Sequence, residues 1–288
     1  MDLGIYSKPY NEVEKIIIEN CKNYRENPTI SYLKPFKIVG NLYYVGDKKV
    51  CAHLIDTGSG LILFDAGYEH TKNMLVQSIL EAGFNPKDVK WLIISHGHFD
   101  HFGACNEFRT LYGTKTFMSK KDCQMIRENE AAALLDMYKN PNATLPIIDY
   151  EFDDGEVLTL GNTQIKCVLS PGHSQGTTSF FFDVFDGAKT YKVGYFGGVG
   201  FLTLYNDFLK KYNQPLSLRS DFLNTLNSLK GIKVDITLGN HPVHNHTLEK
   251  LDKMLKNAGD NPFINATEWD ENLEILKEQY LEFEKIGN

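Results

Sequence analysis

Three imidazoles and one carboxylate stand within six positions of the chain, directly after a short apolar run. The segment reads SHGHFDH and contains His96, His98, Asp100 and His101. Side chains at positions i and i+2 point to the same side where a strand ends, so His96 and His98 can approach one cation together. Asp100 and His101 come next and suit a second cation nearby. Because so many polar groups would be costly to bury without a partner, this pattern predicts a metal site.

Two further histidines complete the predicted set of ligands, and each follows a predicted strand. His173 stands in SPGHSQGTTSF after the run TQIKCVL, where proline and glycine residues allow a tight loop. His241 stands in DITLGNHP, again directly after a strand. His244 and His246 follow within a few positions and compete with it. We favour His241 because it is nearest to the strand end, and we expect its neighbours at the rim of the site or at a helix start.

The first part of the chain predicts the strands that carry the histidine segment. Four short runs, FKIV, LYYV, AHLI and LILF, lie between Phe36 and Gly67 and are separated by turn-forming glycines, which indicates an antiparallel meander. A helix from about Thr71 to Gly83 and a buried strand over residues 91–95 follow. The histidine segment therefore begins where a buried strand ends.

A second β-rich block repeats this order with the runs EVLTL, TQIKCVL, TTSFFFDVF and TYKVGYF. Helices are predicted at Glu107, over residues 120–130 and 220–229, and after Thr247, and VDITL predicts one more strand. Two β-rich blocks, each followed by helices and not divided by a linker, predict a single α+β domain over residues 1–288. Its expected architecture is a four-layer αββα sandwich, with two sheets face to face and helices outside each.

Helices are also predicted at both ends of this domain. An N-terminal extension, about residues 1–34, contains a helix from Asn11 to Pro28 that a capping box of Asn11 and Glu14 would start. A C-terminal helix, about residues 266–285, carries one apolar stripe, which we expect to pack on the core of this chain rather than to form a dimer seam. The stripe consists of Trp269, Leu273, Leu276, Tyr280 and Phe283.

Composition limits the classes of protein to consider. The 288 residues are 42% hydrophobic and 23% charged, as in globular proteins, and a net charge of −7 without a basic block speaks against a nucleic-acid partner. Five dispersed cysteines favour reduced thiols, and neither a signal peptide nor a membrane span stands out in the sequence. We therefore expect a cytoplasmic protein without a membrane partner, or a secreted one if the sequence is a trimmed mature form. Composition does not predict the oligomeric state.

The motifs LILFDAG, HGHFDH, SPGHSQGTTS and GNHP, in this order, resemble the metallo-β-lactamase superfamily. The resemblance extends from about Phe36 to His246 and is strongest to the β-lactamase subclass whose zinc ligands are all histidine and aspartate. It implies the αββα fold and two Zn²⁺ ions per chain, the first held by His96, His98 and His173. The implied ligands of the second ion are Asp100, His101 and His241.

The resemblance also implies a role for Asp65 in LILFDAG, which would orient the ligand loop without touching the metal. Asp56 in LIDTG competes for this role but stands one strand earlier. A dinuclear zinc site would lower the pKa of a bridging water toward roughly 7 and turn it into a hydroxide that attacks a substrate carbonyl. Asp100 would be the catalytic residue that orients this nucleophile. His98 favours zinc, because related di-iron proteins resemble this motif with a carboxylate at that position.

One strand end departs from many hydrolases of the superfamily, which carry a metal-bridging aspartate there. Residues 195–201 read YFGGVGF, which again resembles the β-lactamase subclass, but glycines replace its usual serines. Gly198 and Gly200 offer only backbone N–H groups to a substrate, so carboxylate binding would need other groups. Candidates are the hydroxyls of Thr177 and Thr178 and the lysines Lys210 and Lys211.

These observations favour a β-lactamase-like hydrolase that opens an amide or lactam ring of a small carbonyl compound. The alternative is a cytosolic lactonase, esterase or thioesterase that does not act on antibiotics. A phosphodiesterase is less favoured because the acidic chain lacks basic exosites. The aromatic N-terminal region, residues 143–150 and a long loop over residues 201–219 are expected to border the substrate site.

Overall fold

The two β-rich blocks form two separate sheets in the computed structural model, which describes residues 3–256 and 259–286. The first sheet runs in the order β1 to β7, and β1 to β4 form the predicted antiparallel meander. From β4 to β7 the neighbouring strands are parallel. Its strands are β1 (Phe36–Val39), β2 (Leu42–Tyr44), β3 (His53–Asp56), β4 (Leu61–Phe64), β5 (Val89–Ile93), β6 (Lys115–Ser119) and β7 (Tyr150–Phe152).

The second sheet has the order β12-β11-β10-β9-β8, in which β8 to β11 are antiparallel and β12 joins β11 in parallel. The two sheets pack through aromatic side chains. Phe64 on β4 stacks on Phe182 of β10 with ring centroids 5.3 Å apart, and both rings are buried. The strands of this sheet are β8 (Val157–Leu160), β9 (Thr163–Leu169), β10 (Thr178–Asp186), β11 (Lys189–Phe196) and β12 (Ile236–Gly239).

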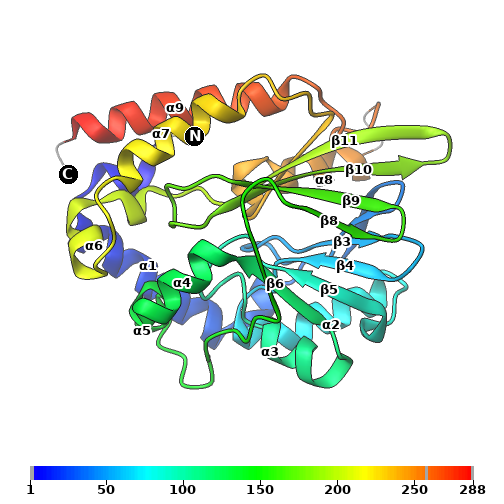
Figure 1. Cartoon of the computed structure of the whole chain (residues 1–288), viewed down its shortest axis with the longest axis horizontal. Coiled ribbons are helices and arrows are strands. Elements are labelled where there is room, and N and C mark those ends of the chain that lie inside the picture. The colour runs from blue at the N-terminus through cyan, green and yellow to red at the C-terminus, as the bar shows by residue number, and fades with distance from the viewer. Residues whose placement is uncertain (1–2, 257–258, 287–288) are drawn as a thin grey trace.

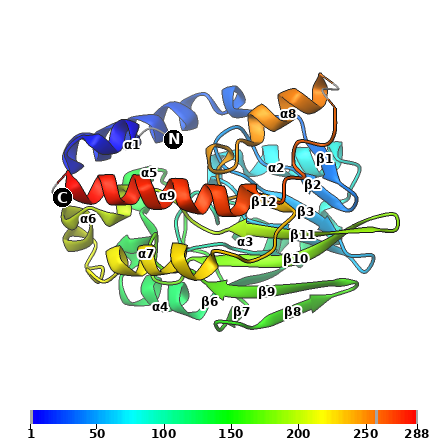
Figure 2. The same cartoon turned by 90° about the horizontal axis from the view of Figure 1, so that it is seen from above.

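Helices cover the outer faces of both sheets, which confirms the predicted αββα sandwich (Figure 1). α7 and α9 lie side by side over the second sheet (Figure 2), whereas α2 and α3 lie under the first. The single-domain organisation stays a prediction. The helices are α1 (Tyr10–Glu26), α2 (Lys72–Glu81), α3 (Cys105–Glu107), α4 (Lys120–Glu128), α5 (Leu135–Tyr138), α6 (Asn206–Lys211), α7 (Leu218–Leu229), α8 (Thr247–Leu255) and α9 (Glu268–Lys285).

The apolar stripe of α9 packs on the core of this chain, as predicted. Trp269, Leu273, Leu276, Tyr280 and Phe283 are all buried, and the indole N–H of Trp269 donates to the carbonyl of Leu229 at the end of α7. A buried ion pair between Lys250 of α8 and Glu268 holds the start of α9, with 2.6 Å between Nζ and Oε2.

Two expectations for the helices were wrong. α1 begins at Tyr10 after Pro9, so Asn11 lies inside the helix and the predicted capping box does not form. Pro9 is the N-cap residue, with φ of −57° and ψ of 149°, and its carbonyl accepts from the N–H of Val13. Residues 201–219, expected to be a long loop, form a 3₁₀ turn at Phe201–Leu204 and then α6. Leu202, Leu204, Tyr205, Phe208 and Tyr212 of this segment are buried, which explains why it is structured.

All five cysteines are buried free thiols, which agrees with the expectation of reduced cysteines. Within the described part of the chain, no helix combines the length and the apolar character that crossing a membrane requires.

Candidate metal centre

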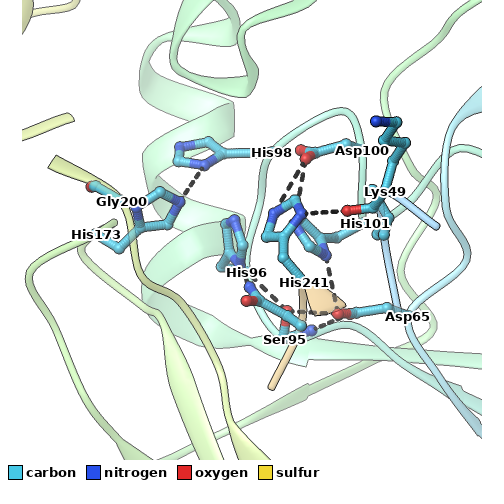
Figure 3. Close-up of polar contacts among 12 residues, drawn as sticks. Lys49, Asp65, Ser95, His96, His98, Asp100, His101, His173, Gly200 and His241 are labelled. Atoms are coloured by element: carbon cyan, nitrogen blue, oxygen red, sulfur yellow. Dashed lines mark hydrogen bonds and ion pairs between the residues drawn. The ribbon is translucent and has the colours of Figure 1, made fainter. Parts of the chain in front are cut away.

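The six predicted ligands converge at one edge of the sandwich (Figure 3). The three loops that carry them follow the carboxyl ends of β5, β9 and β12. One ring nitrogen from each of His96, His98 and His173 lies within 4.8 Å of the other two. Ligand atoms of the second group also lie within 4.8 Å of one another, and this group consists of Asp100, His101 and His241.

In the first group, hydrogen bonds to backbone carbonyls set the direction of two rings. His96 Nδ1 lies 2.9 Å from the carbonyl oxygen of Gly197, and His173 Nδ1 lies 3.2 Å from that of Gly200. These bonds turn Nε2 of both rings toward the common space. His98 enters the same space through Nδ1, which lies 3.1 Å from Nε2 of His173. His96 Nε2 is buried and has no hydrogen-bond partner.

In the second group, too, hydrogen bonds at Nδ1 set the direction of the histidine rings. His101 Nδ1 lies 2.9 Å from Oδ2 of Asp65, and His241 Nδ1 lies 2.7 Å from the carbonyl oxygen of Lys49. Nε2 of both histidines therefore faces Asp100, whose Oδ2 is 3.5 Å from each. His101 Nε2 is buried and makes no hydrogen bond.

These two groups fit metal ions. A buried nitrogen without a hydrogen bond costs about 1–3 kcal/mol, and a cation bound at Nε2 of His96 and of His101 would supply the missing partner. Nitrogen and carboxylate oxygen ligands, three to a group, match the donors that zinc takes in catalytic sites. The bonds at the opposite ring nitrogens fix the tautomers that such coordination needs.

The charges of the centre also suit a cation. Burial, together with the neighbouring imidazoles, holds the pKa of His96 and of His98 well below the usual value, and burial lowers the pKa of His173 to about 4. Burial opposes ionisation of Asp100, but His101 and His241 outweigh it and hold the pKa of Asp100 well below its usual range. Three neutral imidazoles and an ionised carboxylate are thus available near pH 7.

His101 is the exception among the imidazoles. Burial alone would lower the pKa of His101, but the carboxylates of Asp100 and Asp65 outweigh burial and raise it to about 10. Without a metal this ring carries the proton that balances two buried carboxylates. A cation at Nε2 would take over that role.

Known proteins share both the fold and part of this sequence. A family model described as the metallo-beta-lactamase superfamily matches residues 45–184. BJP-1, a subclass B3 metallo-β-lactamase of Bradyrhizobium japonicum, superposes with a TM-score of 0.74 at 28% identity, covering 89% of this chain and 96% of BJP-1. The chain belongs to the metallo-β-lactamase superfamily.

Two curated relatives in this superfamily are named as hydrolases. The probable polyketide biosynthesis zinc-dependent hydrolase PksB of Bacillus subtilis is 26% identical over 154 residues, which are 52% of this chain and 59% of PksB. The hydroxyacylglutathione hydrolase GloC of Haemophilus influenzae is 29% identical over 153 residues, which are 52% of this chain and 68% of GloC. At the level of the family, the prediction of a metallo-hydrolase is confirmed, whereas these names disagree about the substrate.

In this metallo-β-lactamase fold, Asp65 lies behind the second group of ligands. It is fully buried and accepts hydrogen bonds from the N–H and hydroxyl of Ser95, the hydroxyl of Tyr195 and His101 Nδ1. The competing Asp56 is the last residue of β3, and its side chain accepts from the N–H of Gly58 in the turn that follows. Asp65 therefore contacts both a predicted ligand, His101, and the residue before His96, whereas Asp56 contacts neither.

A second buried carboxylate, Asp122 of α4, escaped the sequence analysis. Its oxygens accept hydrogen bonds from the N–H groups of Gly97 and Gly176 and from the hydroxyl of Ser174. In the sequence, Ser119 and Asp122 have the spacing of a helix cap, and the Ser119 hydroxyl does accept from the N–H of Asp122. Because a helix cap already accounts for this spacing, the sequence gives no sign that Asp122 also contacts the ligand loops.

The predicted substrate-binding residues differ in placement. Gly200 lines the cavity above the metal groups, whereas Gly198 packs against His173, whose Cδ2 would lie 3.0 Å from a Cβ at that position. Thr177 is fully buried, and its Oγ1 accepts from the N–H of Ser174. A contact between Thr177 and substrate does not fit this placement. Lys211, another candidate for binding a carboxylate, forms an ion pair with Glu14 instead, at 2.7 Å.

The cavity has a volume of 470 Å³ and is closed on one side by the N-terminal region, as expected. That region contributes Ile5, Tyr6, Ile17, Cys21 and Tyr24. Residues 201–219 contribute Leu202 and Thr203, whereas none of residues 143–150 lines the described cavity. Lys49 is the single lysine or arginine among the lining residues that the structure describes, and sequence reasoning missed it because it stands in a turn without any motif.

Proposed function

We propose that this protein is a dinuclear zinc hydrolase of small carbonyl compounds. The observation that carries the proposal is the pair of ligand groups at the floor of one cavity, with the buried Nε2 atoms of His96 and His101 left without hydrogen bonds. His96, His98 and His173 would hold one zinc ion, and Asp100, His101 and His241 the other. When bound, the two ions supply an activated water and polarise the carbonyl under attack.

The residues of the chain set the geometry for this reaction. The carbonyls of Gly197, Gly200 and Lys49 orient three imidazoles, and Asp65 orients a fourth. Asp100 stays ionised at neutral pH and lies at the open side of the second group, where its carboxylate can accept a hydrogen bond from the reacting water.

A lactam or another amide is the substrate that the structural comparison favours, because a subclass B3 β-lactamase matches over 89% of the chain. A lactone, ester or thioester is the second candidate. It is supported by the glycines at positions 198 and 200, which offer no side chain to a drug carboxylate, and by the likeness to a hydroxyacylglutathione hydrolase. Phosphodiesters remain the third candidate.

The lining of the cavity indicates which substrates within these chemical classes would bind best. Most of its lining is apolar, and Lys49 brings one positive charge to the side where His241 lies. The Lys49 ammonium rests 4.6 Å from the ring centroid of Tyr24. A carbonyl compound with an apolar group and one carboxylate would match both features.

The proposal is tested by assaying the zinc-loaded protein against a chromogenic cephalosporin, a lactone, a thioester and a phosphodiester. We expect turnover of a carbonyl substrate, and we expect His98→Ala to reduce kcat/KM by about 100-fold or more, since a catalytic metal contributes several kcal/mol. His246→Asn is the matched control, because His246 is exposed and asparagine tolerates its φ of 53°. Undiminished turnover in His98→Ala contradicts the mechanism, and turnover of the phosphodiester alone contradicts the substrate class.

A further inference from the structure

Asp122 is a fully buried carboxylate that contacts both loops of the first ligand group but none of the ligands themselves. It lies in the first turn of α4, outside the histidine motifs. Burying a carboxylate is costly unless hydrogen bonds satisfy it, so its partners indicate its role.

The partners of Asp122 come from two segments that are far apart in the sequence. Oδ2 accepts from the N–H of Gly97, at 2.8 Å, and Gly97 stands between His96 and His98. Oδ2 also accepts from the hydroxyl of Ser174, at 2.7 Å, and Oδ1 accepts from the N–H of Gly176, at 2.6 Å. One carboxylate thus ties the loop of two ligands to the loop of the third.

Close packing reinforces this link. Ser119 caps α4 and donates its hydroxyl hydrogen to the carbonyl of Gly176, at 2.7 Å. A Cβ at Gly176 would lie 2.4 Å from the backbone nitrogen of Asp122, and a Cβ at Gly97 would lie 2.8 Å from Cδ1 of Ile126. Both loops therefore lie directly on α4, and at Gly176 the helix backbone leaves no room for a Cβ.

The second ligand group has a different support. Asp65 bonds to His101 directly and reaches the first group only through Ser95, the residue before His96. Asp65 and Asp122 thus approach the centre from different elements, the end of β4 and the start of α4.

We propose that Asp122 is a positioning residue for the first metal ion: it sets the distance between His173 and the pair His96 and His98. This inference rests on the proposed function, because it needs the first group to bind a metal. Loss of the Asp122 acceptor lets the two loops separate, so the first site loses affinity while the second site keeps it.

The test measures cobalt or zinc affinity at one site at a time, by competition with a chromophoric chelator. His241→Ala weakens the second site and reports on the first, whereas His98→Ala does the opposite. Asp122→Asn keeps the size of the side chain but presents an amide NH₂ to N–H donors. We expect it to weaken binding by about 10- to 100-fold in the His241→Ala background and by less than about 2-fold in the His98→Ala background.

Two controls separate positioning from stability. Glu268→Gln disturbs a buried ion pair far from the site and is expected to lower the melting temperature of the metal-free chain without changing either affinity. Ser174→Ala removes one donor to Asp122 and is expected to weaken the first site in the same direction by a smaller factor, which keeps the test open if Asp122→Asn does not fold.

The outcomes are distinct. Equal losses of affinity in both backgrounds, or no loss in the His241→Ala background, contradict the positioning role of Asp122 even if the protein is less stable. A wild-type chain that binds no metal contradicts the proposed function and the role of Asp122 together.

Discussion

Asp65 Oδ2 lies 2.9 Å from Nδ1 of His101, and Asp65 reaches this nitrogen from a left-handed backbone conformation with φ of 58°. Such a conformation costs about 1–2 kcal/mol in a residue other than glycine, so the surroundings must enforce it. The hydroxyls of Ser95 and Tyr195 and the N–H of Ser95 donate to the same carboxylate. The strained backbone of Asp65 thus lies at the residue whose carboxylate contacts the predicted ligand His101.

The first prediction concerns this carboxylate. Asp65→Asn retains the tolerance for a left-handed φ but replaces one acceptor oxygen by a donor, so His101 loses its fixed tautomer. We expect metal affinity at the second group to fall by about 10- to 100-fold, as measured by metal titration in the His98→Ala background. Asp56→Asn, at the end of β3 where the side chain bonds, among the described residues, only to the N–H of Gly58, is the matched control and should leave the affinity unchanged. Equal affinities for Asp65→Asn and the control would refute the role of Asp65.

The second prediction is that metal stabilises the fold. Because the two groups assemble only in the folded chain, ions that bind there shift the unfolding equilibrium, by about 2.7 kcal/mol for each site when free zinc is 100 times its Kd. Elemental analysis should find two zinc ions per chain, and a chelator should lower the melting temperature reversibly. A melting temperature that is indifferent to both zinc and chelator would speak against the centre.

The third prediction concerns the charge of the substrate. Lys49→Met removes the single ammonium in the cavity lining that the structure describes, while keeping most of the side-chain volume. On a cephalosporin with a free carboxylate we expect kcat/KM to fall by about 10-fold or more, because a hydrogen bond to a charged group contributes about 1.5–3 kcal/mol. On the methyl ester of the same compound the change should stay below about 2-fold.

Lys48→Met is the control for this substitution, since Lys48 is an exposed neighbour that does not line the cavity. Equal losses on the acid and on its ester would assign Lys49 a structural role, through its contact with Tyr24. Absence of turnover of both compounds by the wild-type protein would instead count against the lactam as substrate.

The fourth prediction concerns stability away from the metal centre. Burial lowers the pKa of Lys250 and raises that of Glu268, so each charge depends on its partner. Lys250→Met alone should cost about 3–5 kcal/mol of unfolding free energy, because it leaves a buried carboxylate unpaired, whereas Lys250→Met with Glu268→Leu should recover most of that loss. Urea unfolding measures both.

The exposed pair Asp252 and Lys256 is the control for this cycle. Its Oδ2 and Nζ also lie 2.6 Å apart, yet the side chains are 59% and 69% exposed, so Lys256→Met should cost less than about 1 kcal/mol. Similar losses at the two pairs would show that burial does not set the strength of these ion pairs.

Local patterns predicted most of the strands, because alternating apolar runs between glycine turns have few other solutions. The meanders over β1 to β4 and β8 to β11 follow them closely. Short elements without such a pattern, such as α5 and β7, were missed. These elements form because neighbouring strands and helices offer them partners, and this information is not local.

The sequence by itself determined which six side chains could share metal ions, because their residue types and their positions at strand ends already express the chemistry. Only the tertiary structure decided which groups support them. In the sequence, Asp122 looks like part of a helix cap, Lys49 like a turn residue and Thr177 like a free hydroxyl. In the structure, Asp122 bonds to a ligand loop, Lys49 lines the cavity and Thr177 is bonded to Ser174. The ability to bind a metal depends on residue type and local backbone direction, which the sequence shows. Burial and hydrogen-bond partners depend on segments that approach one another only when the two sheets pack together.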